Sequence, residues 1–347
     1  MIAYSLNISW LFQGLEQFDK IIVRNIIVKL LSIFVIFIFV KNQNDLWKYI
    51  LIFSLSEFFG NISLWLYLPS RLVKIDIRKL KFKYHFLPTV MMFLPQVAIQ
   101  IYTVLDKTMV GLLTKDMNQV GYYEQAQNIA KAVLVIMSSV QVVMNSRVAN
   151  ANAIKDKKEV KECLRKSFEF VWLFGIPLMF GLIACSSNIV PWYYGPGFDS
   201  VKPLLISSCP LIIVIGLNGI TGIVYLIHTD QQNAFTKSVV IGALTNIVFN
   251  FILINLIGTI GATISSVIAE TVIFVLHFKY IKKIYNIYDI FKPCVKPIVS
   301  GLIMFVIVYF ASLHLSPSIL HTFLLTILGA TVYSLFIYLM KYKMFMD

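Results

Sequence analysis

The chain has 347 residues, of which 58% are hydrophobic and only 14% are charged. Soluble domains contain about 45–50% apolar and about 25% charged residues, so this composition excludes a soluble domain and predicts a membrane protein. The formal net charge of +13 does not indicate nucleic-acid binding, because neither a basic helix nor an aromatic platform accompanies it.

Ten segments are apolar enough to cross about 30 Å of hydrocarbon as helices of about 20 residues. In chain order they cover residues 21–41, 46–69, 86–114, 120–152, 164–187, 202–228, 233–255, 258–281, 292–314 and 318–341. The connections between them are too short to form a separate soluble domain. The sequence therefore predicts an all-α fold, a polytopic membrane helix bundle of about ten transmembrane helices.

The connections between these segments differ sharply in positive charge. Alternate connections, around residues 71–83, 155–166, 237, 279–296 and 341–343, contain 20 Lys and Arg residues, whereas the intervening connections contain four. Positively charged connections are retained on the cytoplasmic side of a membrane. This alternation predicts that the Lys-rich connections and the C-terminus are cytoplasmic.

Polar residues recur at helical spacing in the third and fourth segments. Steps of three and four residues place each set on one helix face. Because polar side chains within a membrane face protein or a water-filled cavity, the two rows predict a hydrophilic path. The third segment carries Gln96, Gln100, Thr103 and Lys107, and the fourth carries Glu124, Gln127, Lys131, Ser138, Gln141, Asn145 and Asn152.

Three carboxylates lie within the apolar segments. Glu57 and Glu270 are deep in the second and eighth segments, where each requires a partner, a proton or water. Asp106 adjoins Lys107, but sequence neighbours project about 100° apart on a helix and do not pair. The residues leave two roles open for all three: a structural contact with a neighbouring helix, or protonation-linked transport.

Other chemistry is not indicated by the sequence. Cys163, Cys185, Cys209 and Cys294 are far apart and lack metal-ligand spacing, so no metal or cofactor is expected. No segment resembles a phosphate-binding loop, which argues against ATP as a direct driver. The longest external connection, about Asn188 to Lys202, is shorter than the catalytic loop expected of a polysaccharide polymerase.

Five separated strings carry a family resemblance, namely SWLFQGLEQF, FLPQVAIQIYTVLDKTMVG, VGYYEQAQ, VPWYYGPGF and IGATISSVIAE. Together they resemble the polysaccharide transporter (Wzx-type) flippases of the oligosaccharidyl-lipid, multidrug and polysaccharide exporter superfamily. The resemblance implies a MATE-like fold with two lobes, and a bacterial inner-membrane protein that is not an enzyme. It also implies transfer of undecaprenyl-diphosphate-linked oligosaccharide to the outer leaflet, for O-antigen, capsule or exopolysaccharide assembly.

The chain departs from the family pattern at its start. Family members begin about three and a half helices earlier, so the resemblance implies an incomplete fold. We expect residues 1–85 to be a remnant of the N-terminal lobe, 86–283 a six-helix C-terminal lobe, and 284–347 a peripheral helix pair. Our hypothesis is a truncated or split reading frame, with an inactive isolated chain as one outcome. The string VMNSRVAN also has Asn145 and Ser146 where relatives read Leu-Pro.

The expected substrate assigns roles to the polar residues. Its diphosphate is anionic, and moving it through hydrocarbon unaided costs many kcal/mol, so cations in a wet cavity remove most of the penalty. Arg24, which also fits snorkelling to the interface, is one such cation. The expected set is Arg24, Lys29, Lys107 and Lys131 for the head group, Gln96, Gln100, Thr103, Gln141 and Asn145 for the sugar, and Glu57, Asp106 and Glu270 for ion or proton coupling.

Two other functions remain compatible with the sequence. A cation-coupled drug antiporter of the same superfamily would share the fold, and a membrane polysaccharide polymerase would share the membrane and the pathway. In the flippase interpretation, the partners are the lipid-linked oligosaccharide, the lipid bilayer, and polymerase and chain-length proteins of the same pathway, with no nucleic acid.

Overall fold

The computed structural model describes residues 2–15, 17–42, 45–68 and 82–342. Its regular elements in these ranges are all helical, and ten helices are long and apolar enough to cross a membrane. These ten helices confirm the predicted all-α bundle and the ten predicted segments. The chain divides into two units, Met1–Lys81 and Phe82–Asp347, so the three-part division expected from the family resemblance stays a prediction.

The first unit is a helical hairpin with a folded N-terminal segment. Its elements are α1 (Ile2–Ser5), α2 (Ser9–Gly14), α3 (Phe18–Phe39), α4 (Leu46–Ser63) and the 3-10 helix η2 (Leu64–Tyr67). Asn61 donates to the carbonyl of Ala3, and the Trp65 indole donates to the carbonyl of Leu6. These bonds tie the N-terminal segment to α4 over a small core of Ile8, Phe12, Ile21, Leu64 and Leu68.

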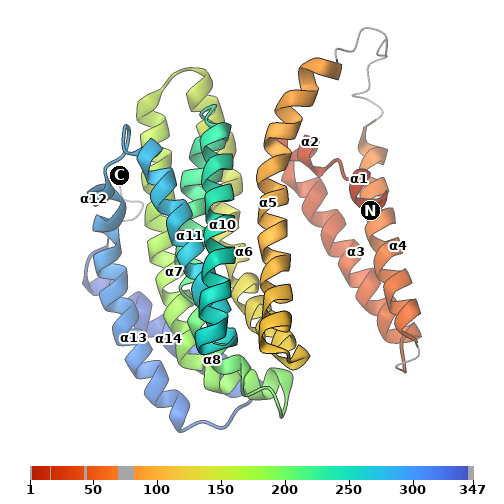
Figure 1. Cartoon of the computed structure of the whole chain (residues 1–347), viewed down its shortest axis with the longest axis vertical. Helices are drawn as coiled ribbons and strands as arrows, with labels where there is room; N and C mark the ends of the chain where they lie inside the picture. Colours follow the sequence, from red (N-terminus) through yellow and green to blue (C-terminus); the bar gives the residue numbers. More distant parts are fainter. Residues whose placement is uncertain (1, 16, 43–44, 69–81, 343–347) are drawn as a thin grey trace. The chain divides into compact units, whose positions relative to one another are not determined.

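The second unit contains the remaining helices (Figure 1). They are α5 (Phe82–Thr114), α6 (Met117–Ala153), α7 (Lys157–Tyr194), α8 (Val201–Ser208), α9 (Leu211–Asn218), η5 (Gly219–Ile227), α10 (Gln232–Ile257), α11 (Thr259–Ile281), α12 (Ile287–Phe291), η6 (Lys292–Cys294), α13 (Val295–Leu313) and α14 (Ile319–Leu339). Helix α7 packs against α6, α9, α13 and α14.

Two helical contacts place the polar residues of this unit. Helices α10 and α11 form a hairpin, and α5 packs along α10. Gly261 allows the hairpin to close, because a Cβ at this position would overlap the backbone carbonyl of Leu253. The inner faces of α5, α6, α10 and α11 therefore meet, and each contributes polar side chains to the interior.

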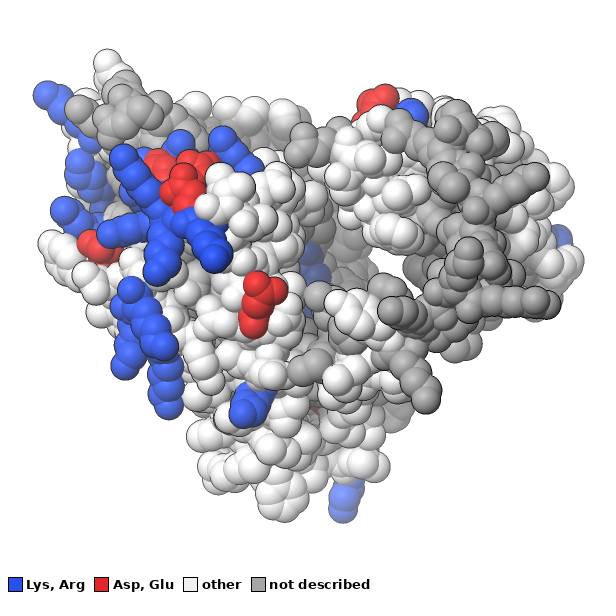
Figure 2. Space-filling model, turned by 90° about the horizontal axis from the view of Figure 1, so that it is seen from above, with Lys and Arg blue, Asp and Glu red and all other residues white. Residues whose placement is uncertain are grey.

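Positive charge gathers at one end of the second unit. The starts of α7 and α13 and the ends of α11 and α14 lie at this end, and Figure 2 shows their Lys and Arg side chains grouped around a few acidic ones. They include the predicted Lys-rich connections around residues 155–166, 279–296 and 341, whereas most of the predicted connection around 71–83 lies outside the described residues. We call this the Lys-rich end; its cytoplasmic location stays a prediction.

Candidate functional site

The α5–α6 hairpin carries an ion pair on its open side. Lys107 Nζ lies 2.5 Å from Glu124 Oε1, and the two side chains are 36% and 45% exposed. The sequence predicted Lys107 as a head-group cation but did not identify Glu124 as its partner. The pair holds the ammonium group in place on a partly wet surface.

Further predicted residues lie on this side of the hairpin. Gln96, Gln100 and Lys131 are exposed, and Thr103 is half-buried with its hydroxyl bonded to the carbonyls of Ile99 and Gln100. Lys131 is seven residues beyond Glu124, and Gln100 is seven residues before Lys107. In antiparallel helices both steps run about 10 Å in the same direction, so Lys131 and Gln100 lie at a similar level.

The predicted polar row of α6 divides into two rows. Glu124, Lys131 and Ser138 are open to the outside of the unit, whereas Gln127 and Gln141 turn inward. The amide of Gln127 lies 3.5 Å from the Ser208 hydroxyl, and Gln141 fills the space beside the backbone of Gly219. Residues three positions apart differ by about 60° around a helix. Gln141 is therefore a packing residue as well as a predicted sugar contact.

Asn145 lies one turn beyond Gln141, between the outward-facing and the inward-facing row. It is half-buried, and its side-chain oxygen is buried without a hydrogen-bond partner among the described residues. A buried acceptor without a donor is costly, so this amide is available to a hydroxyl-bearing ligand.

A buried carboxylate lies directly behind the ion pair. Asp106 is 4% exposed and accepts hydrogen bonds from Asn250 Nδ2 at 2.6 Å, Tyr123 Oη at 3.1 Å and Ser266 Oγ at 3.1 Å. Its donors come from α10, α6 and α11, so four helices meet at this side chain. Within the described part of the chain, Asp106 forms no ion pair, and its charge is compensated by these donors alone.

Glu270 forms a second carboxylate centre beside the first. Its Oε1 accepts from Tyr102 Oη at 2.9 Å, and its Oε2 accepts from Asn218 Nδ2 at 2.7 Å. Tyr102 lies one turn from Asp106 on α5, just as Ser266 lies one turn from Glu270 on α11. The two carboxylate centres are therefore neighbours along α5 and α11.

The surroundings of these carboxylates are rich in neutral oxygen atoms. The side-chain oxygens of Asn218 and Asn250 are buried without a partner among the described residues. No group of three or more His, Cys, Asp or Glu residues suited to a metal was found in the same residues. Carboxylate and amide oxygens suit a proton or a hard cation better than a transition metal.

The first unit contains the other predicted charges. Arg24 donates to Asn61 Oδ1 at 3.2 Å and to Ser9 Oγ at 3.1 Å, and Glu57 attracts it electrostatically. Arg24 also lines a groove of about 490 Å³ between α3 and α4, whereas Lys29 is exposed. Arg24 is thus held inside the unit by neutral oxygens rather than snorkelling freely.

Sequence reasoning missed the phenols that bind the two carboxylates. Tyr102 and Tyr123 are 9% and 3% exposed and were counted with the apolar residues of their segments. Tyr102 binds Glu270 across a separation of 168 residues, so no local spacing indicated this contact. Tyr123 had no local signal either, because its contact with Asp106 joins two different helices.

Ten apolar helices and a polar interior define a multi-pass membrane protein. A family model described as polysaccharide biosynthesis protein matches residues 5–203, more than half of the chain. The chain belongs to this family, in agreement with the predicted resemblance to polysaccharide transporters.

Named relatives are described as transporters and flippases. The chain is 23% identical over 275 residues to the "Putative O-antigen transporter" of Escherichia coli strain K12, covering 79% of this chain and 66% of the relative. It is 23% identical over 239 residues to the "Probable low-salt glycan biosynthesis flippase Agl15" of Haloferax volcanii, covering 67% of this chain and 49% of the relative. The chain thus spans from half to two thirds of the length of these relatives.

A solved structure shares the fold. The lipid II flippase MurJ in an inward closed conformation is similar with a TM-score of 0.65 and 20% identity. The similarity covers 83% of this chain and 60% of that chain. At this identity the likeness supports the fold alone.

Proposed function

We propose that this chain is a flippase for undecaprenyl-diphosphate-linked oligosaccharide in the bacterial inner membrane. It delivers repeat units to the outer leaflet by alternating access, for O-antigen, capsule or exopolysaccharide assembly, with its C-terminus in the cytoplasm. The family membership and the flippase relatives support this proposal. Polymerase and chain-length proteins would receive its product, and its own step breaks no covalent bond.

One observation carries the mechanism. Two consecutive residues of α5 contact two consecutive residues of α6: Asp106 bonds to Tyr123, and Lys107 pairs with Glu124. A shift of either helix that changes one contact must change the other, because the backbone joins them. This linkage connects the buried carboxylate to the cation on the open side.

The ion pair is the proposed binding element for the diphosphate. A diphosphate carries more negative charge than Glu124 and competes with it for Lys107. Lys131, Arg24 and Lys29 are the further proposed cations. The proposed sugar contacts are Gln96, Gln100, Thr103, Gln141 and Asn145.

The two neighbouring carboxylates are the proposed coupling centre. Burial disfavours their charged forms, so binding of a proton or a small cation stabilises the site. Release of that proton or cation favours rearrangement of the helices. Asp106 is the main candidate because it contacts three helices, and Glu270 shares the centre. Glu57, near Arg24 in the first unit, is the third proposed coupling residue.

The test measures flipping in vesicles that contain the full chain and a fluorescent lipid-linked oligosaccharide. Lys107→Gln removes the proposed head-group cation, and we expect the flipping rate to fall by about tenfold or more. Lys115→Gln is the matched control, because Lys115 is exposed in the turn of the same hairpin. Equal rates in the two variants would contradict the assignment of Lys107. Dye efflux without oligosaccharide flipping would instead identify a drug antiporter.

A further inference from the structure

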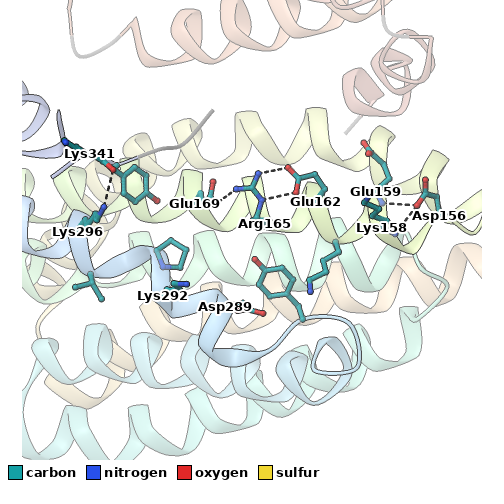
Figure 3. Close-up of a pocket in the computed structure, with 15 residues that line it drawn as sticks. Asp156, Lys158, Glu159, Glu162, Arg165, Glu169, Asp289, Lys292, Lys296 and Lys341 are labelled. Carbon is teal, nitrogen blue, oxygen red and sulfur yellow. Dashed lines mark hydrogen bonds and ion pairs between the residues drawn. The ribbon is translucent and has the colours of Figure 1, made fainter. Parts of the chain in front are cut away.

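A second site lies at the Lys-rich end, away from the α5–α6 ion pair. A pocket of about 1280 Å³ lies between the start of α7, the α12–η6 segment, the start of α13 and the residues after α14 (Figure 3). The predicted functions leave this pocket without a role. Its lining contains eleven charged side chains, namely Asp156, Lys158, Glu159, Lys161, Glu162, Arg165, Glu169, Asp289, Lys292, Lys296 and Lys341.

Three of the five carboxylates in this lining have partners, although Glu169 Oε2 is buried without one among the described residues. Arg165 binds Glu162 through two nitrogens, at 2.6 and 2.9 Å, and reaches Glu169 at 2.8 Å. Asp156 accepts from the backbone amides of Lys158 and Glu159 and thereby caps α7. These bonds are drawn in Figure 3. One arginine and the backbone amides therefore engage three of the five acidic side chains, whereas Glu159 and Asp289 form no ion pair among the described residues.

The lysines of the pocket are not compensated in this way. In the part of the chain that the structure describes, none of them forms an ion pair. Lys296 donates to the carbonyl of Lys341 at 3.2 Å, and Lys161 lies over the ring of Tyr285. Burial raises the pKa of Tyr285 to about 12, so this ring is neutral. Within the described residues, five ammonium groups of the pocket therefore lack an ion-pair partner, namely those of Lys158, Lys161, Lys292, Lys296 and Lys341. With Arg165, the lining holds six positive and five negative side chains.

An exposed apolar row leads from the pocket along α13. Val295 lines the pocket and is 60% exposed. Exposed side chains follow at steps of four, three, four and four residues, which places them on one helix face. They are Val299, Leu302, Val306 and Phe310. Helix α13 belongs to a candidate membrane span, where an exposed apolar row suits contact with lipid. An acyl chain lying on the row would bring its head group to the pocket.

We propose that this pocket binds the phosphate head group of an anionic phospholipid, with one acyl chain along the α13 row. Uncompensated lysines supply the attraction for the phosphate oxygens. The apolar row distinguishes a lipid from a free phosphate, which would gain nothing from it. Because α7, α13 and α14 all reach the pocket, the bound lipid joins the outer helix pair to the centre of the unit.

The experiment is native mass spectrometry of the detergent-purified full chain with phosphatidylglycerol. We expect one phosphatidylglycerol to be retained, with phosphatidylcholine bound at least tenfold more weakly. Lys292→Ala with Lys296→Ala should weaken binding by about 10- to 30-fold, because each lysine near the surface contributes a several-fold attraction. Lys282→Ala with Lys283→Ala is the matched control, since these lysines are exposed at the same end outside the pocket.

Further arms separate the remaining outcomes. Replacing Lys292 and Lys296 by Arg preserves charge and should retain binding, which excludes loss through misfolding. Inorganic phosphate at the same concentration should not displace the lipid. Displacement by inorganic phosphate would overturn the lipid assignment. Equal binding of the two phospholipids, or equal losses in the two double-alanine variants, would overturn the site.

Discussion

Asp106 and Lys107 are adjacent in the sequence but face different environments. Asp106 points among α6, α10 and α11 and is nearly fully buried, whereas Lys107 pairs with Glu124 on the open side. The turn of about 100° between successive helical residues causes this divergence. A single peptide bond thereby joins Asp106, a buried group suited to coupling, to Lys107, an accessible cation suited to binding an anion.

Asp106→Asn separates the coupling role from a structural role. Asn keeps the size and one acceptor oxygen, so we expect a thermal midpoint close to that of the unmodified chain. The loss of charge should lower the flipping rate by at least about tenfold and remove its dependence on pH or cation gradient. Asp199→Asn, in an exposed connection, serves as the control. An unchanged rate and gradient dependence in Asp106→Asn would assign the side chain to structure alone.

At the level of elements, the α10–α11 hairpin positions the donors for Asp106. Asn250 lies on α10 and Ser266 on α11, and both reach Asp106 because the two helices approach closely. Gly261 permits this approach at the start of α11. Glycine has a lower helix propensity than alanine. It is favoured at this position because it lets the two helix backbones approach closely.

Gly261→Ala should destabilise the chain. The added methyl overlaps the backbone of Leu253 rather than a flexible side chain. Such overpacking lowers the free energy of unfolding by about 1–3 kcal/mol. Gly181→Ala, within α7, has open space around the added methyl. The higher helix propensity of alanine should raise the free energy of unfolding by up to about 1 kcal/mol. Thermal unfolding midpoints in detergent compare the two variants. A midpoint for Gly261→Ala at or above that of Gly181→Ala would contradict the packing argument.

Across the whole molecule, charge is distributed by connection rather than by helix. Many Lys and Arg side chains of the second unit group at one end (Figure 2). Moving such connections across a membrane is costly, which is the physical basis for their retention in the cytoplasm. The proposed lipid site belongs to this end, whereas the Lys107–Glu124 pair lies in the half of the α5–α6 hairpin that is nearer the opposite end.

The proposed orientation is testable by cysteine labelling. The four native cysteines are buried, so an impermeant maleimide has little background reaction. Asp199→Cys should react in intact cells, because its connection is predicted to be external. Lys283→Cys, at the Lys-rich end, should react only after permeabilisation. The reverse pattern would place the Lys-rich end outside the cytoplasm.

The sequence by itself determined the ten spans, the alternation of charged connections and the rows of polar residues. Each depends on local composition or on the helical repeat, which any short window of sequence contains. The same repeat predicted a single row on α6, and the structure places Gln127 and Gln141 of this row against neighbouring helices. A spacing of three or four residues fixes a face only to within about 60°, and packing decides which residues at its edge are buried.

Only the tertiary structure decided the partners of the polar groups. Asp106 meets Asn250 and Ser266 across sequence separations of 144 and 160 residues, and no local periodicity specifies such contacts. The same holds for the Lys-rich pocket, where α7 and α13 meet with their charged ends. Side-chain partners are set by which helices pack together, whereas the existence of each helix is set by its own apolar residues.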